Sequence, residues 1–358
     1  MPNYSAPIPP SAGERTRRDF LRTIGCAFVA PLAGCVGRPG AAAAPSDYVV
    51  TVRGPIPAEE LGFTLPHEHV FVTHRADPSR SMTDPEVAVR ELTHYASAGG
   101  RSMVDMNNIG RQNPTALRLI SERTGLNIVM GTGYFKHDRG GMPPETHDLS
   151  VEDMTAQFVR DIEIGVNNTG IRAGIIGEVG LSRPMTSTEE RGLRAAAHAQ
   201  RHTGVGINLH FDIGGGLPEH EAALDILAAE GADLRRVALS HFQPDPKQMA
   251  HFHRIAGRGC FVEFDLFGLH KCLKMRLLPE DRVMFDVIRR LVDEGLSSHL
   301  LLSQDIFAKA CLVEYGGFGY AHILRTILPQ LEAIGVERSA IRRMTVENPR
   351  RLLAVRAK

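Results

Sequence analysis

The sequence lacks several features that mark common classes of protein. Its 358 residues carry 41 basic and 41 acidic side chains and no long basic run, which argues against a nucleic-acid partner. There is no Gly-x-Ser-x-Gly motif, and no phosphate-binding or dinucleotide-binding glycine fingerprint joins a strand to a helix. These absences argue against a serine-nucleophile hydrolase, a Walker-type nucleotide-binding protein and a dinucleotide-dependent enzyme.

Cysteine is scarce, at five residues, and its spacing is not that of a zinc finger. Cys26 and Cys35 lie in the N-terminal segment, whereas Cys260, Cys272 and Cys311 lie in the body of the chain. We expect the three body cysteines to be free and at least partly buried. A structural disulfide between two of them is the less favoured alternative.

The N-terminal segment has the pattern of an export signal. Thr16-Arg17-Arg18-Asp19-Phe20-Leu21-Arg22 matches the twin-arginine motif closely. The apolar stretch at 24–33 that follows is too short to span a bilayer as a stable helix. We therefore predict export by the twin-arginine route and a periplasmic location.

The end of this signal resembles the lipidation site of bacterial lipoproteins. In Leu32-Ala33-Gly34-Cys35, lipidation of Cys35 is favoured over ordinary cleavage near Ala44. The protein would then contact the membrane only through this N-terminal lipid anchor. The predicted boundaries are 1–46 for the signal and flexible tether, and 47–358 for the folded domain.

After the tether, apolar strand-like runs alternate with amphipathic stretches of helical period. The strands are expected to end near His69, Asp105, Gly131, Glu178, His210, His241, Asp265 and Asp305. The helical stretches lie at 85–98, 114–124, 151–166, 188–203, 218–230, 246–257 and 279–294. This alternation indicates parallel βαβ units, and eight of them predict an α/β fold of the (β/α)8 TIM-barrel type. A β-hairpin turning at Gly54-Pro55 should precede the barrel, and helices at 323–331 and 349–354 should close it.

Two histidines one residue apart, His67 and His69, end the first barrel strand. Side chains alternate along a strand, so both imidazoles point to one face, and imidazole is a common zinc ligand. Later strands close on four more residues of ligand type, namely Glu178, His210, His241 and Asp305. Any one of these could instead be a hydrogen-bonded core histidine or a helix-capping carboxylate. Because TIM-barrel active sites lie at the C-terminal strand ends, where all six fall, we predict a metal centre.

This mixture of imidazoles and carboxylates suits hydrolysis assisted by two metal ions. Two ions about 3.5–4 Å apart can hold a bridging hydroxide and polarise a scissile carbonyl or phosphoryl oxygen. Asp305 is the candidate to accept the proton and return it to the leaving group. We therefore predict a hydrolase that acts on a small molecule. A ligand-binding lipoprotein without catalytic activity is the alternative.

These residues resemble the phosphotriesterase-like branch of the amidohydrolase superfamily, over nearly all of the chain from about Tyr48 onward. The resemblance is carried by Gly62-Phe63-Thr64-Leu65-Pro66-His67-Glu68-His69, Arg172-Ala173-Gly174-Ile175-Ile176-Gly177-Glu178, the two histidine-ended strands, Ser303-Gln304-Asp305 and Thr345-Val346-Glu347-Asn348-Pro349. It implies two divalent ions, zinc being favoured. His67, His69 and Asp305 would bind the more buried ion, and His210 and His241 the more exposed one.

The bridging position distinguishes subgroups of this family. Phosphotriesterases and lactonases bridge the two ions with a carboxylated lysine, but this chain has Glu178 there. The resemblance therefore implies a subgroup that bridges with glutamate. It also implies a homodimer.

The expected substrate pocket departs from those of phosphotriesterases and lactonases. Phe135 aligns with the lactonase tyrosine or phosphotriesterase tryptophan, Tyr134 lies one position away, and Leu266 replaces a His or Arg. With Asp265 and Phe267 they are expected to line the pocket, core packing or structural hydrogen bonding being the alternative. These segments most resemble the phosphotriesterase-related proteins, which include an animal N-acyltaurine amidase. A small amide, ester or lactone is therefore the expected substrate, and a phosphotriester or phosphoester the alternative.

Overall fold

The computed structural model describes residues 47–136, 142–213, 216–242, 245, 249–275 and 278–356. These residues all belong to one compact unit. The predicted signal, the lipobox with Cys35 and the tether lie outside the described residues, so their roles stay predictions. None of the described helices combines the length and the apolar composition that a membrane span requires.

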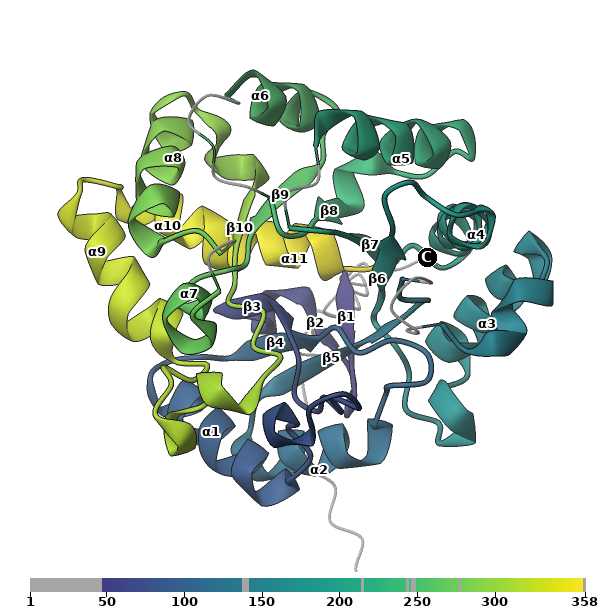
Figure 1. The fold of residues 1–358 in the computed structure, drawn as a ribbon, viewed down its shortest axis with the longest axis horizontal. Helices are drawn as coiled ribbons and strands as arrows, with labels where there is room; N and C mark the ends of the chain where they lie inside the picture. Colours follow the sequence, from purple (N-terminus) through teal and green to yellow (C-terminus); the bar gives the residue numbers. More distant parts are fainter. Residues whose placement is uncertain are drawn as a thin grey trace, which may run out of the picture. The chain divides into compact units, whose positions relative to one another are not determined.

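Eight parallel strands form one sheet that curls into a nearly closed barrel surrounded by helices (Figure 1). In order around the barrel they are β3 (Thr64–Glu68), β4 (Ser102–Asp105), β5 (Asn127–Thr132), β6 (Ile175–Leu181), β7 (Gly206–Phe211), β8 (Val237–Leu239), β9 (Phe261–Phe264) and β10 (Leu300–Leu302). The last strand lies beside the first, and just beyond it the Asp305 N–H donates to the His67 carbonyl at 3.2 Å. The predicted TIM barrel is therefore confirmed.

Helices follow the strands on the outer surface of the barrel. They are α1 (Pro85–Ser97), α2 (Pro114–Thr124), α3 (Val151–Glu163), α4 (Ser187–Thr203), α5 (Leu217–Ala229), α6 (Met249–Gly257), α7 (Leu269–Leu273) and α8 (Asp281–Asp293). After β10 come a π-helix (Ile323–Ile327), α9 (Leu328–Ala333), α10 (Arg338–Arg342), a second π-helix (Arg343–Glu347) and α11 (Asn348–Leu353). The sequence pattern predicts most of these, but not α7, which is too short to show a helical period, nor α10 and the second π-helix, which continue without a break into α11.

Local signals explain where several helices begin and end. The Asp84 side chain accepts hydrogen bonds from the first N–H groups of α1, and Ser150 forms a capping box with Asp153 at the start of α3. Gly125 and Gly204 end α2 and α4 with φ of +75° and +78°, a left-handed conformation that glycine adopts without steric cost.

A β-hairpin precedes the barrel, as expected, but its turn is shifted. β1 (Tyr48–Thr51) pairs with β2 (Gly54–Pro57) in antiparallel register, with Thr51 opposite Gly54. The turn therefore falls on Val52 and Arg53, and the predicted turn pair Gly54-Pro55 already belongs to the second strand. Proline is tolerated there because β2 is an edge strand with few ladder bonds to donate.

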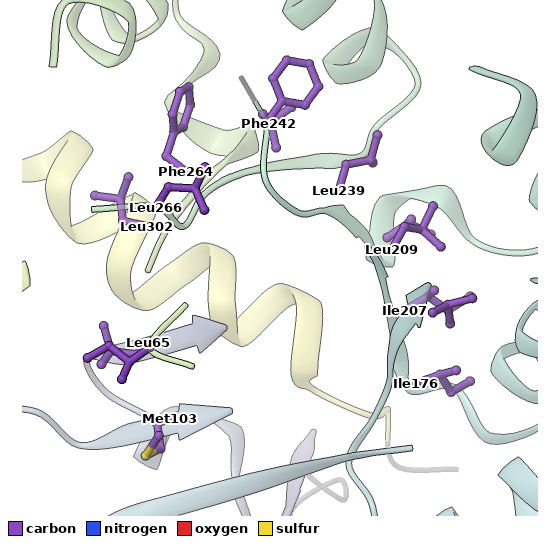
Figure 2. Close-up of a cluster of buried hydrophobic side chains, with 14 of the residues drawn as sticks. Leu65, Met103, Ile176, Ile207, Leu209, Leu239, Phe242, Phe264, Leu266 and Leu302 are labelled. Carbon is purple, nitrogen blue, oxygen red and sulfur yellow. The ribbon is translucent and has the colours of Figure 1, made fainter. Parts of the chain in front are cut away.

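The barrel strands alternate their side chains between two apolar layers. Figure 2 shows the outer layer, in which strand residues such as Leu65, Ile207 and Leu302 face the surrounding helices. Side chains one position away, including Leu301, belong to an inner cluster, to which the hairpin and α11 also contribute. The lower part of the barrel is thus apolar and closed. This leaves the C-terminal strand ends as the place where polar side chains gather.

A buried pair of histidines joins α5 to α6 outside the barrel. The Nδ1 of His220 lies 3.1 Å from the Nε2 of His251, and the rings of Phe211 and Phe242 pack against them. Burial, with a smaller contribution from the neighbouring His251, lowers the pKa of His220 to about 3. The pair is therefore neutral in the folded protein at neutral pH.

This pair predicts a pH-dependent stability. An unfolded histidine titrates near 6.5, so the unfolded chain binds more protons than the folded one between about pH 6.5 and 3. The stability that His220 contributes is therefore complete above pH 6.5 and is lost as the pH falls toward 3. Thermal unfolding of chelated protein should show a steeper drop in Tm from pH 7.5 to 5 for the wild type than for His220→Gln. Equal slopes would contradict this assignment.

Candidate metal centre

The six predicted ligands converge on the mouth of the barrel from five strands. One oxygen of Glu178, Oε1, lies 2.8 Å from His210 Nδ1 and 3.0 Å from His67 Nε2. The same oxygen lies 3.9 Å from the Nε2 atoms of both His69 and His241. A single carboxylate oxygen is thus surrounded by four imidazoles.

Asp305, just after β10, faces the same cluster from beside the strand that carries His67. Its Oδ1 lies 3.3 Å from His69 Nε2 and 3.8 Å from His67 Nε2, and its Oδ2 lies 3.9 Å from His241 Nδ1. The Nε2 of His241 and the Nδ1 of His210 are 2.9 Å apart, so these two imidazoles also aim at one point. All six side chains therefore meet in one place.

Irregular backbone places several of these side chains. The register shifts of β3 against β4 and of β6 against β7 span the positions of His67 and Glu178. Such irregularities commonly redirect side chains beside active sites. Glu178 accordingly lies inside β6, which continues to Leu181, and not at the predicted strand end.

Two of the candidate ligands also have left-handed backbone conformations. His241 has φ of +56° and Asp305 has φ of +50°, which costs a non-glycine residue about 1–2 kcal/mol. Hydrogen bonds compensate: the His241 N–H donates to both carboxylate oxygens of Asp265, at 3.1 and 3.0 Å. Strained backbone of this kind clusters at functional sites.

A buried polar layer lies directly below the ligands and orients His67. The Nδ1 of His67 lies 3.1 Å from Glu263 Oε2 and 3.0 Å from the Ser240 hydroxyl. The same Glu263 oxygen accepts hydrogen bonds from Asn208 and Ser240, at 2.8 and 2.9 Å. These contacts turn the Nε2 of His67 toward Glu178, and such supporting hydrogen bonds are typical of metal-binding histidines.

Glu68, between the two ligand histidines, has a role that sequence reasoning missed. It is fully buried and accepts hydrogen bonds from the Ser303 hydroxyl and the N–H groups of Gln304 and Ile306, at 2.8, 3.0 and 2.9 Å. It therefore holds the loop that carries Asp305. Burial raises the pKa of Glu68 to about 7 against the effect of these hydrogen bonds. Strand alternation could have indicated this role from the sequence, because it turns Glu68 away from His67 and His69.

The electrostatics of the cluster favour an ionised central carboxylate. Burial acts to raise the pKa of Glu178, but the charges and hydrogen bonds of His210, His67 and His69 hold it well below its usual range. Burial together with the neighbouring His241 charge lowers the pKa of His210, in spite of Glu178. Burial acts to lower the pKa of His67, His69 and His241 as well, but neighbouring carboxylates raise all three, that of His241 to about 9. Metal binding would therefore release protons from these imidazoles, because a ligand imidazole is neutral.

The donor set fits divalent cations. Ligand atoms of His67, Glu178 and His241 lie within 4.8 Å of one another, as do those of His67, His69 and Asp305. Among the described residues, the buried Nδ1 of His69 has no hydrogen-bond partner. Imidazole nitrogens mixed with carboxylate oxygens suit zinc and similar transition metals better than calcium, which prefers oxygen ligands. The residues present could therefore hold metal ions.

The predicted pocket residues fall into different places. Phe135 is half-buried and packs its ring 4.7 Å from that of His210, centre to centre. Tyr134 packs against a ring of α3 in the core, where Leu266 and Phe267 are also buried. Asp265 is fully buried and its Oδ1 lies 3.1 Å from His241 Nδ1. Phe135 and Asp265 thus each contact a candidate ligand, and the pocket roles of all five residues stay predictions.

The cysteines of the body take no part in this cluster. Cys260 and Cys311 are buried, Cys272 is half-buried, and all three are free thiols, as expected.

Fold and site together define a TIM-barrel protein whose mouth carries a cluster suited to metal ions. A family model, Phosphotriesterase family, matches residues 47–353. The chain is 31% identical to the phosphotriesterase-related protein of Nematostella vectensis, over 85% of this chain and 98% of that protein. It is 30% identical to the N-acetyltaurine hydrolase of Homo sapiens, over 86% of this chain and 98% of that protein.

A solved structure shows the same architecture. The resiniferatoxin-binding protein from Rhodobacter sphaeroides matches with a TM-score of 0.81 at 33% identity, covering 86% of this chain and 94% of that one. The chain therefore belongs to the phosphotriesterase family, as the sequence motifs predict, and is a hydrolase.

Proposed function

We propose that this hydrolase uses two divalent metal ions, zinc being favoured, to cleave the amide bond of a small N-acylated amine. The observation that carries the metal centre is the position of Glu178 Oε1, which contacts His67 and His210 at 3.0 and 2.8 Å. Amide cleavage is supported by the N-acetyltaurine hydrolase activity named for relatives that align over most of this chain.

The ligand assignment divides the cluster into two sets that share one residue. His67, His69 and Asp305 would hold one ion, His210 and His241 the other, and Glu178 both. When bound, the ions supply Lewis-acid polarisation of the scissile carbonyl and lower the pKa of a bound water to near neutrality.

The protein's own residues orient the site and move the proton. Glu263 and Asp265 hold the imidazoles of His67 and His241 through the Nδ1 contacts at 3.1 Å. Asp305 accepts the proton of the attacking water and delivers it to the departing nitrogen. An amide needs this delivery, since an unprotonated amine is a poor leaving group, and proton transfer of this kind contributes about 10²–10⁴-fold to rate.

The proposal also covers the cellular location of the enzyme and its oligomeric state. The twin-arginine motif around Arg17 and Arg18 supports export to the periplasm, and Cys35 supports a lipid anchor. The family resemblance supports a homodimer. A membrane fraction that releases the protein only with detergent, and not with salt, would support the anchor.

A substrate panel on zinc-loaded or manganese-loaded protein tests the proposed reaction. The panel contains N-acetyltaurine, N-acetyl-β-alanine, an aryl acetate ester, a γ-lactone and a diethyl aryl phosphotriester. We expect an amide to have the highest kcat/KM. Turnover of the lactone or phosphotriester without turnover of any amide would overturn amide cleavage. The absence of all turnover in protein that retains its metal would favour the non-catalytic binding protein.

A further inference from the structure

A short turn after β4 is hydrogen-bonded to the strand that carries the candidate ligand Glu178. The Asn108 side chain donates to the backbone carbonyl of Glu178 at 3.0 Å, and the Arg111 N–H closes the turn on the Asn108 carbonyl at 2.8 Å. The Ile109 N–H and the Gln112 side chain donate to carbonyls at the end of β5, at 3.0 and 2.8 Å. The position of Arg111 is therefore tied to the strand that carries the central carboxylate.

The side chain of Arg111 is also held in place. Its guanidinium carbon lies 4.3 Å from the centre of the Phe135 ring, in a cation–π contact. Phe135 in turn packs its ring 4.7 Å from that of His210 at an interplanar angle of 63°. One aromatic ring thus separates a guanidinium from a ligand of the candidate metal centre.

This guanidinium lacks an anionic partner within the described part of the chain. No carboxylate oxygen of those residues forms an ion pair with Arg111, whereas Arg118 on the following helix pairs with Glu122 at 3.2 Å. Arg111 is exposed, but the groups packed around it partly desolvate the guanidinium and so lower its pKa; Glu178 raises this pKa, and the positive charge of Arg75 lowers it. An arginine stays protonated at neutral pH despite such a shift. The mouth therefore carries the positive charge of Arg111, and Arg75 lies near enough to add to the positive potential there.

We propose that Arg111 is a specificity-determining residue that binds the negatively charged end of the substrate, a carboxylate or a sulfonate. This inference rests on the proposed amide hydrolysis. The two contacts of Phe135, at 4.3 and 4.7 Å, place the guanidinium carbon at most about 9 Å from the centre of the His210 ring. An anion four or five bonds from the scissile carbonyl carbon extends about 5–6 Å, and a hydrogen bond of about 3 Å to the guanidinium completes that span. The planar guanidinium presents a fork of donors that matches carboxylate and sulfonate oxygens. Phe135 would set the angle of that fork and pack against the spacer of the substrate.

The alternative is that the exposed side chain of Arg111 merely covers an aromatic ring and meets solvent. The two interpretations differ in one respect: only an anion-binding role makes the preference for substrate charge depend on Arg111. Three amides with the same acetyl group and two-carbon spacer isolate that variable. They are N-acetyl-β-alanine, its neutral primary amide, and the cationic N-acetylethylenediamine.

The test compares kcat/KM for the three amides in the metal-loaded wild type, Arg111→Gln and Arg118→Gln. We expect the wild type to prefer the anion, and Arg111→Gln to lower the ratio of anionic to neutral kcat/KM about 10-fold to 100-fold. The control Arg118→Gln removes the same charge from an exposed ion pair on α2 and should keep the wild-type ratio. In Arg111→Glu the preference should shift toward the cationic amide.

A binding measurement separates this inference from the proposed reaction. Calorimetric titration of chelated, metal-free protein with N-acetyl-β-alanine and with its neutral amide needs no turnover. Weaker binding of the anion to Arg111→Gln, relative to the neutral amide, would support the anion site even if no amide were hydrolysed. If charge preference in both turnover and binding were the same in Arg111→Gln, Arg118→Gln and the wild type, the anion site would be overturned while amide hydrolysis stood.

Discussion

Replacing Glu178 with glutamine is expected to lower kcat/KM by at least about 10²–10³-fold and to reduce metal content, because glutamine keeps the shape but removes the shared negative charge. One oxygen of this side chain meets His67 and His210 at 3.0 and 2.8 Å, and two more imidazoles lie at 3.9 Å. A metal pair provides several kcal/mol of charge stabilisation in the transition state, which corresponds to this loss in rate. Steady-state kinetics and elemental analysis of the same preparation measure both effects.

Glu91→Gln is the matched control for this substitution. Glu91 is also a buried glutamate, but it accepts hydrogen bonds from the N–H groups of Val313 and Glu314, at 3.0 and 2.8 Å, away from the ligands. It should lower Tm without changing the number of bound metal ions. If Glu178→Gln kept wild-type metal content and more than half of the wild-type kcat/KM, Glu178 would not be the shared ligand.

Asp305→Asn is expected to lower kcat about 10²–10⁴-fold, the range typical of a lost proton-transfer group. Asparagine tolerates the left-handed backbone at φ of +50°, so the loop should keep its conformation. What changes is the charge 3.3 Å from His69 Nε2 and the ability to carry a proton. Rates measured at saturating substrate, together with metal content, test this expectation.

Substrates with different leaving groups separate the two proposed roles of Asp305, metal binding and proton transfer. A substrate with an acidic leaving group, such as an aryl ester, needs no proton delivery, so its rate should fall less in Asp305→Asn than that of an amide. An equal loss for both substrates would assign Asp305 to metal binding alone. A variant with unchanged kcat for the amide would exclude Asp305 from the reaction.

The barrel could be predicted from the sequence because its signal is periodic and repeated. Apolar runs of strand length, separated by amphipathic stretches, locate eight strands whose ends agree with the structure to within a few residues. Prediction fails where an element is short. The helix α7 has five residues and begins after Gly268 at φ of +80°, a backbone conformation that the hydrophobic periodicity does not indicate. Likewise, the hairpin turn depends on pairing register, which Gly54-Pro55 alone does not determine.

The six candidate ligands were predictable because each is of ligand type and lies at or near a strand end, and parallel strand ends meet. The detailed geometry of the six side chains could not be predicted, because it depends on tertiary contacts. The irregularity that turns Glu178 inward is a property of β6 paired with β7. Similarly, the contact of Arg111 with Phe135 joins two different βα loops. Sequence reasoning left Asp265 open between a pocket group and a structural acceptor, and only the fold shows its contact with His241.

The most direct test of the central claim is an anomalous-difference map from a crystal of the zinc-loaded protein, collected at the zinc absorption edge. The proposed assignment predicts two peaks about 3.5–4 Å apart, one beside His69 and the other beside His210, with Glu178 between them. A map with no peak at the barrel mouth, or with peaks bound only by residues outside this cluster, would contradict it.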